Sequence, residues 1–323
     1  MSTPPQRLLL LDTASLYFRA FFGVPDTVKA PDGTPVNAVR GLLDFIARLL
    51  TDYRPTHLAC CWDNDWRPRW RVELLPSYKA HRVETPVPGG RDVEEVPDAL
   101  ETQVPLIREV LAAVGLAVVG ADDHEADDVI GTLATRAGMP VEVVTGDRDL
   151  FQLVDDEAGV RVLYTARGVG KHEQVTSSVL REKYGIDGRQ YADFAVLRGD
   201  PSDGLPGVAG VGEKTAATLL NRFGDLEGII AAAGDREADL APGPRRRIKD
   251  AADYLGVAPK VVRVVRDLDL DDPDLLLPGS DHGHPLPAAP GRLEELTERW
   301  GLGGSARRLL EALASVTPPQ RGS

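Results

Sequence analysis

The chain has 323 residues, 42% of them hydrophobic, so it can bury a sizeable core without disulfide support. Its two cysteines, Cys60 and Cys61, are adjacent and lack the spacing of zinc ligands, and no apolar stretch has the length of a membrane span or the layout of a signal peptide. The net charge of −13 argues against nucleic acid as a partner, unless the carboxylates gather to bind divalent cations. We expect a cytoplasmic protein.

Short apolar runs occupy residues 7–12, 57–63 and 141–147, and each run ends in an aspartate. Their length and composition are typical of buried strands. Helical apolar patterns at residues 39–50 and 100–114 lie between them, which predicts an α/β fold with a parallel sheet flanked by helices. Because such sheets bind ligands beyond the carboxyl ends of their strands, the three aspartates predict chemistry at that edge.

The rest of the chain divides by composition. Residues 64–97 are rich in Trp, Arg and Pro and predict a long excursion from the sheet. From residue 175 the pattern becomes helical around a Gly/Pro-punctuated turn, and a later polar connection leads to a predicted pair of helices and a six-residue tail. We therefore expect a sheet domain, a helical region and a C-terminal segment at residues 7–174, 175–270 and 271–323.

Nine carboxylates fall at positions where they can converge. Glu125 and Asp128 are three apart on a predicted helix and share a face, and Asp147 and Asp149 are two apart on extended chain and point the same way. Oxygen donors without His or Cys favour Mg²⁺ or Mn²⁺ over zinc, and two such ions can hydrolyse a phosphodiester bond. The nine acids are Asp12, Asp63, Glu125, Asp127, Asp128, Asp147, Asp149, Asp200 and Asp203.

Each acid also has an ordinary structural interpretation. A single aspartate after a strand is more often a turn or helix-cap residue, and the acids from Glu125 onward would suit a solvated helix start. The combination of three strand ends with two further acidic clusters favours the metal site.

A glycine-rich turn is the first candidate for DNA binding. Glycines let the backbone approach a phosphate, and the following helix N-terminus offers free N–H groups that hold a backbone without reading sequence. The turn lacks the adjacent Gly-Lys-Ser/Thr of a P-loop and the preceding strand of a dinucleotide site, whereas an ordinary helix–turn–helix corner stays open as an alternative. The residues concerned are Gly207, Gly210, Gly212, Lys214 and Thr215.

The excursion is the second candidate. Arg67, Arg69 and Arg71 supply positive charge there, and the interleaved Trp66 and Trp70 can stack on bases. A solvated charged face is the alternative, although the number of tryptophans argues against it.

Four motifs carry a resemblance: YKAHR from Tyr78, EADDVIGTLA from Glu125, TGDRDLFQL from Thr145 and LRGDPSDGLPGVAGVGEKTA from Leu197. Together they resemble the bacterial and phage 5′-3′ exonucleases, or flap endonucleases, including the N-terminal 5′ nuclease domain of DNA polymerase I, here as a stand-alone protein. The resemblance covers about residues 8–270. It implies a PIN-like fold with a helical arch over residues 64–97 and a helical DNA-binding region that contains a helix-three-turn-helix.

The resemblance also implies roles for particular residues. Lys79 and Arg82 match catalytic cations near the scissile phosphate, and the glycine turn matches a duplex-binding element that holds K⁺. Two metal groups are implied, with Asp12, Asp63, Glu125, Asp127 and Asp128 in the first and Asp147, Asp149, Asp200 and Asp203 in the second. One departure is visible, because similar proteins have Ser-Asp-Asn where this chain has Ser202, Asp203 and Gly204.

These observations predict a structure-specific 5′ nuclease that needs two or more Mg²⁺ or Mn²⁺ ions. Its expected substrates are 5′ flaps, branched DNA and RNA–DNA primer ends, and a separate DNA polymerase and ligase would complete the repair. We expect a monomer without membrane contact. A PIN-like ribonuclease and a non-catalytic junction-binding protein stay open as alternatives.

Overall fold

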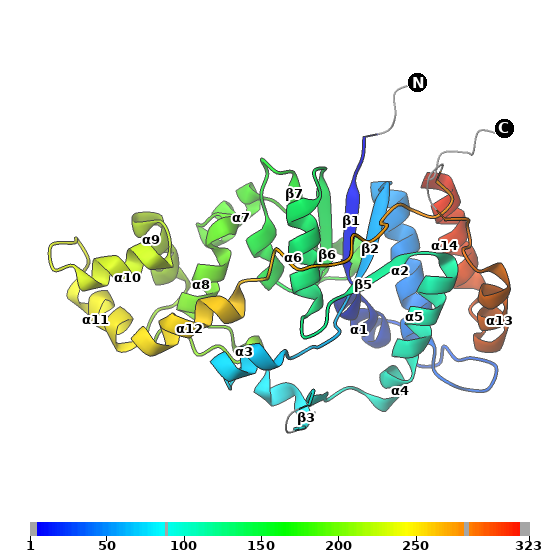
Figure 1. The fold of residues 1–323 in the computed structure, drawn as a ribbon, viewed down its shortest axis with the longest axis horizontal. Coiled ribbons are helices and arrows are strands. Elements are labelled where there is room, and N and C mark those ends of the chain that lie inside the picture. The colour runs from blue at the N-terminus through cyan, green and yellow to red at the C-terminus, as the bar shows by residue number, and fades with distance from the viewer. Residues whose placement is uncertain (1–4, 88–89, 281–283, 317–323) are drawn as a thin grey trace.

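The computed structural model describes residues 5–87, 90–280 and 284–316. At its centre is a six-stranded sheet in the order β5-β2-β1-β6-β7-β8, parallel throughout except that β8 pairs antiparallel with β7 (Figure 1). This order puts β1 between β2 and β6, so the strands followed by aspartates are direct neighbours. The strands are β1 (Leu8–Asp12), β2 (His57–Trp62), β5 (Ala117–Gly120), β6 (Val141–Thr145), β7 (Val160–Tyr164) and β8 (Glu173–Val175).

The three predicted strands are confirmed as β1, β2 and β6. β1 is buried on both of its faces, which explains why it reads as a continuous leucine run rather than an alternating pattern. Leu9 and Leu11 face one hydrophobic core, whereas Leu8 and Leu10 face the other. The sheet therefore separates two cores.

Helices cover both faces of the sheet. The core that contains Leu9 is closed by α1 (Thr13–Gly23), α2 (Asn37–Tyr53) and α5 (Gln103–Val114). The opposite core begins with α6 (Ala126–Arg136) and continues into the helical region. Among the residues that the structure describes, no helix is long and apolar enough to cross a membrane.

The excursion between β2 and α5 is only partly helical. It contains the six-residue helix α3 (Arg69–Leu74), a 3-10 turn (Ala80–Arg82) and an antiparallel hairpin of β3 (Val83–Thr85) with β4 (Val93–Glu94), before α4 (Asp98–Glu101). The expected arch is therefore a short helix and a hairpin in its described residues, because prolines at 68, 76 and 86 interrupt any longer helix.

The helical region begins where the sheet ends. The glycine-rich turn joins α8 to α9, as the sequence predicts, and both helices pack into the core that contains Leu8. The region consists of α7 (Ser177–Tyr184), α8 (Tyr191–Arg198), α9 (Glu213–Phe223), α10 (Leu226–Gly234), α11 (Pro242–Asp250) and α12 (Ala252–Val262).

The segment after residue 271 returns to the sheet. Leu58 of β2 donates its backbone N–H to the carbonyl of Leu275 at 2.8 Å, which places this segment beside β2. The predicted helix pair is confirmed as α13 (Pro290–Trp300) and α14 (Gly303–Val316), and α14 lies along α2 (Figure 1). The expected six-residue tail lies outside the described residues.

Candidate active site

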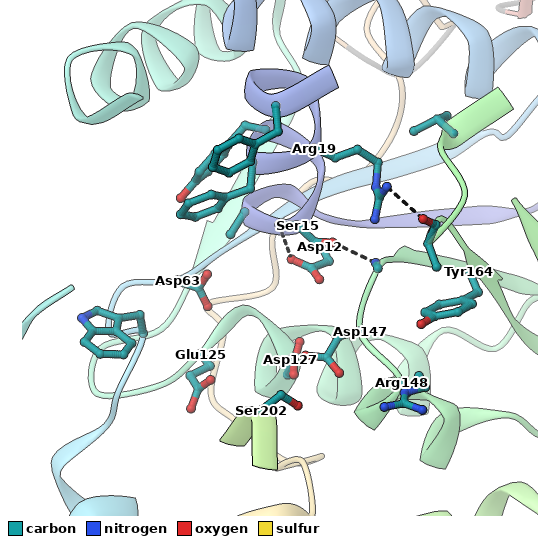
Figure 2. Close-up of a pocket in the computed structure, with 18 of the residues that line it drawn as sticks. Asp12, Ser15, Arg19, Asp63, Glu125, Asp127, Asp147, Arg148, Tyr164 and Ser202 are labelled. Atoms are coloured by element: carbon teal, nitrogen blue, oxygen red, sulfur yellow. Dashed lines mark hydrogen bonds between the residues drawn. The ribbon is translucent and has the colours of Figure 1, made fainter. Parts of the chain in front are cut away.

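Four aspartates from different elements face one space at the C-terminal edge of the sheet. Asp12 ends β1, Asp63 directly follows β2 and Asp147 lies two residues beyond β6. Asp127 reaches the same space from the first turn of α6, and Figure 2 shows it beside Asp147. The strand-end aspartates therefore gather as the sequence predicts, and their role as metal ligands stays a prediction.

Neighbouring elements hold two of these carboxylates in place. Asp12 accepts the N–H of Ser15 at 3.1 Å, which caps α1, and the hydroxyl of Thr145 at 2.6 Å. Asp63 accepts the N–H of Ala126, the first residue of α6, at 2.7 Å. Since a carboxylate has about four lone-pair sites, each of them keeps acceptor capacity for a further ligand.

A cleft of about 1320 Å³ opens over this acidic edge. Its walls combine acids with cations and aromatic side chains, which is the composition expected for binding an anionic polymer across a metal site. The acids in its lining include Asp12, Asp63, Glu125, Asp127, Asp147 and Asp200, the cations include Arg19, Lys79, Arg82, Arg91, Arg148, Arg167 and Lys171, and the aromatic residues include Tyr17, Phe18, Phe22 and Trp62.

Burial and mutual repulsion raise the pKa values of the clustered acids. Burial, with the Asp63 charge second, raises the pKa of Asp12 to about 7. Burial, followed by the Asp147 charge, raises the pKa of Asp127 well above its usual value, and burial raises that of Asp203 to about 6. The nearby charge of Lys79 does not outweigh burial and repulsion at Asp127 and Asp203, so an oxygen-binding divalent cation fits the donors present.

Two of the predicted acids belong to a buried ion-pair network. Arg71 donates to Glu125 at 3.0 Å and to both oxygens of Asp128 at 2.9 and 2.7 Å. Glu125 also accepts the hydroxyl of Tyr78 at 2.7 Å and pairs with Lys79. Although burial raises the pKa of Glu125, the charges of Lys79 and Arg71 outweigh it and lower that pKa.

Asp128 is the one predicted ligand that this arrangement turns away from the edge. It is fully buried, and beyond its pairing with Arg71 it accepts the N–H of Val265 at 2.8 Å. Its oxygens are therefore already engaged, and we correct its assignment from metal ligand to anchor of the network.

The second predicted group lies around the same edge. Asp127, Asp149 and Asp203 line one small cavity, while Asp200 lines the main cleft and pairs with Arg198 at 3.0 Å. Within the described ranges, no three Asp, Glu, His or Cys side chains stand close enough to hold one ion. Repulsion between the carboxylates favours their separation, and Glu125 is also held by Arg71 and Lys79. Acidic side chains must therefore rotate before three of them can bind one ion.

The two predicted catalytic cations, Lys79 and Arg82, both line the cleft. Burial lowers the pKa of Lys79, but the charge of Glu125 raises it well above its usual value, so the ammonium group is charged. Arg82 keeps 42% of its side chain exposed and pairs with Glu94 at 3.5 Å. Both cations therefore line the same cleft as the acids, and their catalytic role stays a prediction.

Two of the three arginines predicted to contact DNA are instead structural. Arg67 is buried and donates to the carbonyls of Tyr78 at 2.6 Å and Pro76 at 3.1 Å, which braces the excursion. Arg71 is 2% exposed and fully committed to carboxylates and to the carbonyl of Val261. We therefore correct the assignment of Arg67 and Arg71 as DNA contacts, because their guanidinium groups are buried. The Arg69 side chain, in contrast, is 68% exposed.

Gly204 lies against the backbone of the excursion. Its φ is +72°, and a Cβ there would lie 2.0 Å from the Ser77 carbonyl oxygen. In addition, Lys79 donates its backbone N–H to the carbonyl of Asp203 at 3.0 Å. Glycine thus lets the backbone of the Lys79 segment pack directly on the Asp203 turn.

The glycine-rich turn has the geometry that the sequence predicts. Gly207 and Gly210 have φ values of +70° and +74°, and a Cβ at Gly207 would lie 2.5 Å from the backbone nitrogen of Gly199. Gly212 caps α9 without a side-chain hydrogen bond, and it and Lys214 are exposed. The N-terminus of α9, with Thr215 in its first turn, therefore faces solvent.

Comparison with known proteins matches both halves of the chain. Residues 7–185 match the model of the 5'-3' exonuclease N-terminal resolvase-like domain, and residues 186–278 match that of the 5'-3' exonuclease C-terminal SAM fold. The chain belongs to the 5′-3′ exonuclease family. It is accordingly an enzyme of the nuclease class, as the sequence predicts.

Relatives include proteins of similar length and larger polymerases. The chain is 64% identical to a 5'-3' exonuclease of Streptomyces coelicolor over 95% of its own length and 100% of that protein, and 53% identical to a 5'-3' exonuclease of Mycobacterium tuberculosis over 96% and 98%. It is 41% identical to DNA polymerase I of Mycobacterium bovis, over 82% of this chain and 27% of the polymerase.

Solved structures share the fold at low identity. The T5 D15 protein co-crystallized with metal ions aligns with a TM-score of 0.62 and 16% identity over 97% of this chain and 100% of that one. The catalytic core of Rad2 in complex with DNA substrate aligns with a TM-score of 0.57 and 16% identity over 97% and 92%. These likenesses confirm the α/β fold of this 5′-3′ exonuclease family member with its helical C-terminal region.

Sequence reasoning missed two parts of the cleft wall. Tyr17, Phe18 and Phe22 come from α1, and Phe22 is 73% exposed. The signal was present, because these aromatic residues follow Asp12 within three helical turns. Arg148 is the second part, and a single arginine between two acids gives no signal of its own in the sequence.

Proposed function

We propose that this 5′-3′ exonuclease family member is a structure-specific nuclease that uses Mg²⁺ or Mn²⁺ to hydrolyse phosphodiester bonds at 5′ flaps and 5′ ends of DNA. The observation that carries the proposal is the cluster of Asp12, Asp63, Asp127 and Asp147 beneath a large cleft, with cations on the cleft walls. Without a cation, burial and repulsion raise the free energy of the ionised carboxylates in this cluster. Metal binding would explain why so many acids gather there.

The proposed role of each acid follows from its position at the edge of the sheet. Asp12, Asp63, Asp127 and Asp147 would hold ions at the edge, with Asp149, Asp200 and Asp203 as further ligands and Glu125 joining when Lys79 leaves it. Bound there, two ions would activate water and stabilise the leaving oxygen. Lys79 and Arg82 would neutralise charge that develops on the phosphate, since both cations line the cleft.

DNA would be held on two sides of the edge. The exposed N-terminus of α9, with Gly207, Gly210, Gly212, Lys214 and Thr215, would grip the duplex backbone, and a K⁺ ion would assist there. Arg69 and the excursion would contact the flap. In this proposal residues 7–174 carry most of the chemistry, residues 175–270 hold the duplex and supply Asp200 and Asp203, and residues 271–323 support the sheet.

The wider setting belongs to the same proposal. A nuclease that removes 5′ flaps leaves a gap or nick, so a DNA polymerase and a ligase must act with it in sequence. RNA–DNA primer ends are included among the substrates, because backbone contacts do not read the base. The enzyme would work as a monomer in the cytoplasm on chromosomal DNA.

Cleavage of a 5′-labelled double-flap DNA tests the proposal. The protein is incubated with Mg²⁺, Mn²⁺ or EDTA, and the Asp147→Ala variant runs in parallel. Release of a short 5′ fragment that needs metal and Asp147 is the expected result. Intact DNA in every metal, despite binding, would show a silent junction binder, and preference for a matched RNA flap would show a ribonuclease.

A further inference from the structure

One cation stands within the acidic edge itself. Arg148 lies between Asp147 and Asp149, directly after β6, and lines the main cleft. Figure 2 shows its side chain beside Asp147 and close to Tyr164. Its position therefore brings a guanidinium group to the place where a phosphate would meet the acids.

Arg148 differs from the paired cations of the same cleft. Lys79 pairs with Glu125, Arg82 pairs with Glu94 at 3.5 Å and Arg91 pairs with Asp122 at 3.6 Å. In the described part of the chain, Arg148 pairs with no carboxylate; burial lowers its pKa, but the neighbouring phenol groups of Tyr191, Tyr164 and Tyr184 raise it. Its charge is therefore left for another anion.

Aromatic residues of two adjoining elements are neighbours of this side chain. Tyr184 ends α7 and Tyr191 begins α8, with their ring centroids 5.7 Å apart in an edge-to-face arrangement. Tyr191 is fully buried and also packs on Phe151 at 5.2 Å. Packed rings beside the guanidinium leave it less free than an arginine surrounded by water, so less entropy is lost on binding.

The same elements lead to the glycine turn. α8 runs from Tyr191 to Arg198, and the turn follows at once, with Asp200 and Ser202 in the lining of the same cleft as Arg148. A strand that spans the acidic edge and the N-terminus of α9 would therefore cross the cleft that Arg148 lines. Lys79 and Arg82 come from the excursion, a separate element of the cleft wall.

We infer that Arg148 contacts a backbone phosphate of the DNA strand between the acidic edge and the glycine turn, with Tyr184 as its positioning residue. A guanidinium forms charge-assisted, two-pronged hydrogen bonds with phosphate oxygens and so suits this ligand. The contact also offsets the repulsion between DNA and the acids of the edge. This inference rests on the proposed function.

The test uses the full chain with Arg148→Ala, Arg148→Lys and Tyr184→Phe, and Arg307→Ala as control. Arg307 is 72% exposed on α14, remote in sequence from the cleft residues. Single-turnover cleavage of a 5′ flap is measured with Mg²⁺, and binding of a nicked duplex in EDTA is measured against salt. Mn²⁺ binding to each variant without DNA shows whether the edge is intact.

Arg148→Ala should lower the cleavage rate about 10- to 100-fold, the size of one lost charge-assisted hydrogen bond, and reduce the salt slope of DNA binding by about 1. Arg148→Lys should keep the slope and recover part of the rate. Tyr184→Phe should slow cleavage less, and should add nothing in the Arg148→Ala background. Mn²⁺ binding and the Arg307→Ala control should match the wild type.

An unchanged rate and salt slope in Arg148→Ala would overturn the inference, as would weaker Mn²⁺ binding by that variant without DNA. Additive effects of the two substitutions would remove the role of Tyr184. If the wild type cleaves no substrate, the proposed function fails, yet the salt slope in EDTA still decides whether Arg148 contacts phosphate.

Discussion

The contact at Gly204 makes a quantitative prediction about Lys79. A Cβ at this position would lie 2.0 Å from the Ser77 oxygen, whereas real Cβ atoms are essentially never found under 3.0 Å, so Gly204→Ala must move the 77–79 segment by about 1 Å. A displacement of about 1 Å at a catalytic group costs about 100-fold in rate. The positive φ adds about 1–2 kcal/mol of destabilisation for a non-glycine residue.

Single-turnover flap cleavage and urea unfolding together measure these effects. Gly204→Ala should cleave about 100-fold more slowly at saturating Mg²⁺. If the loss acts through Lys79, the same substitution should change little in a Lys79→Ala background. Gly204→Asn separates the two causes, because Asn tolerates a positive φ but still carries the Cβ.

Gly256 of α12 supplies the matched control, since a Cβ there meets nothing within 4 Å. Gly256→Ala should leave cleavage unchanged and stabilise the protein by about 0.5–1 kcal/mol. Wild-type cleavage by Gly204→Ala, or equal losses with and without Lys79, would refute the reasoning.

Three further predictions concern the buried charges. Arg71→Met leaves the buried Asp128 without its cation and Glu125 with Lys79 as its remaining cation, and should lower the free energy of unfolding in urea by about 3–5 kcal/mol, whereas loss of a DNA contact alone would leave stability unchanged. Asp127→Asn should reduce metal-dependent cleavage at least about 100-fold yet raise the melting temperature in EDTA, because burial and Asp147 raise the pKa of this carboxyl; a lower melting temperature would contradict the repulsion. Burial raises the pKa of Asp12 to about 7, so between about pH 4 and 7 the folded state binds a proton that the unfolded state lacks. The melting temperature in EDTA should therefore fall as pH rises through that window, with Mg²⁺ restoring it most at the upper end, and a rise in EDTA would show the sign to be wrong.

The gathering of Asp12, Asp63 and Asp147 could be predicted from the sequence, because each follows an apolar run and parallel strands end at one edge. The strands β5 and β8 could not be found in this way. β5 has four residues and continues an apolar stretch from α5, and β8 has only three. Strands this short contain too few residues to show a two-residue hydrophobic period, so the sequence pattern does not distinguish them from loops.

The arginines of the excursion show where local pattern fails. Arg67, Arg69 and Arg71 alternate in sequence and look alike, but only Arg69 is exposed. Arg71 is buried because it meets Glu125 and Asp128, more than 50 residues away, and this contact has no local signature. The requirement for glycine at position 204 is equally non-local, because a Cβ there would clash with the backbone of Ser77, which is distant in sequence.

The return of the C-terminal segment to the sheet has a consequence for how the chain folds during synthesis. Arg308 of α14 bonds Asp44 of α2 at 2.9 Å across 264 residues, and α14 covers an apolar face of α2 that forms early in the chain. Until α14 leaves the ribosome, that face of α2 is bare, so the first core cannot close before almost the whole chain has been made. Truncation before residue 303 should therefore give aggregation rather than a smaller active nuclease.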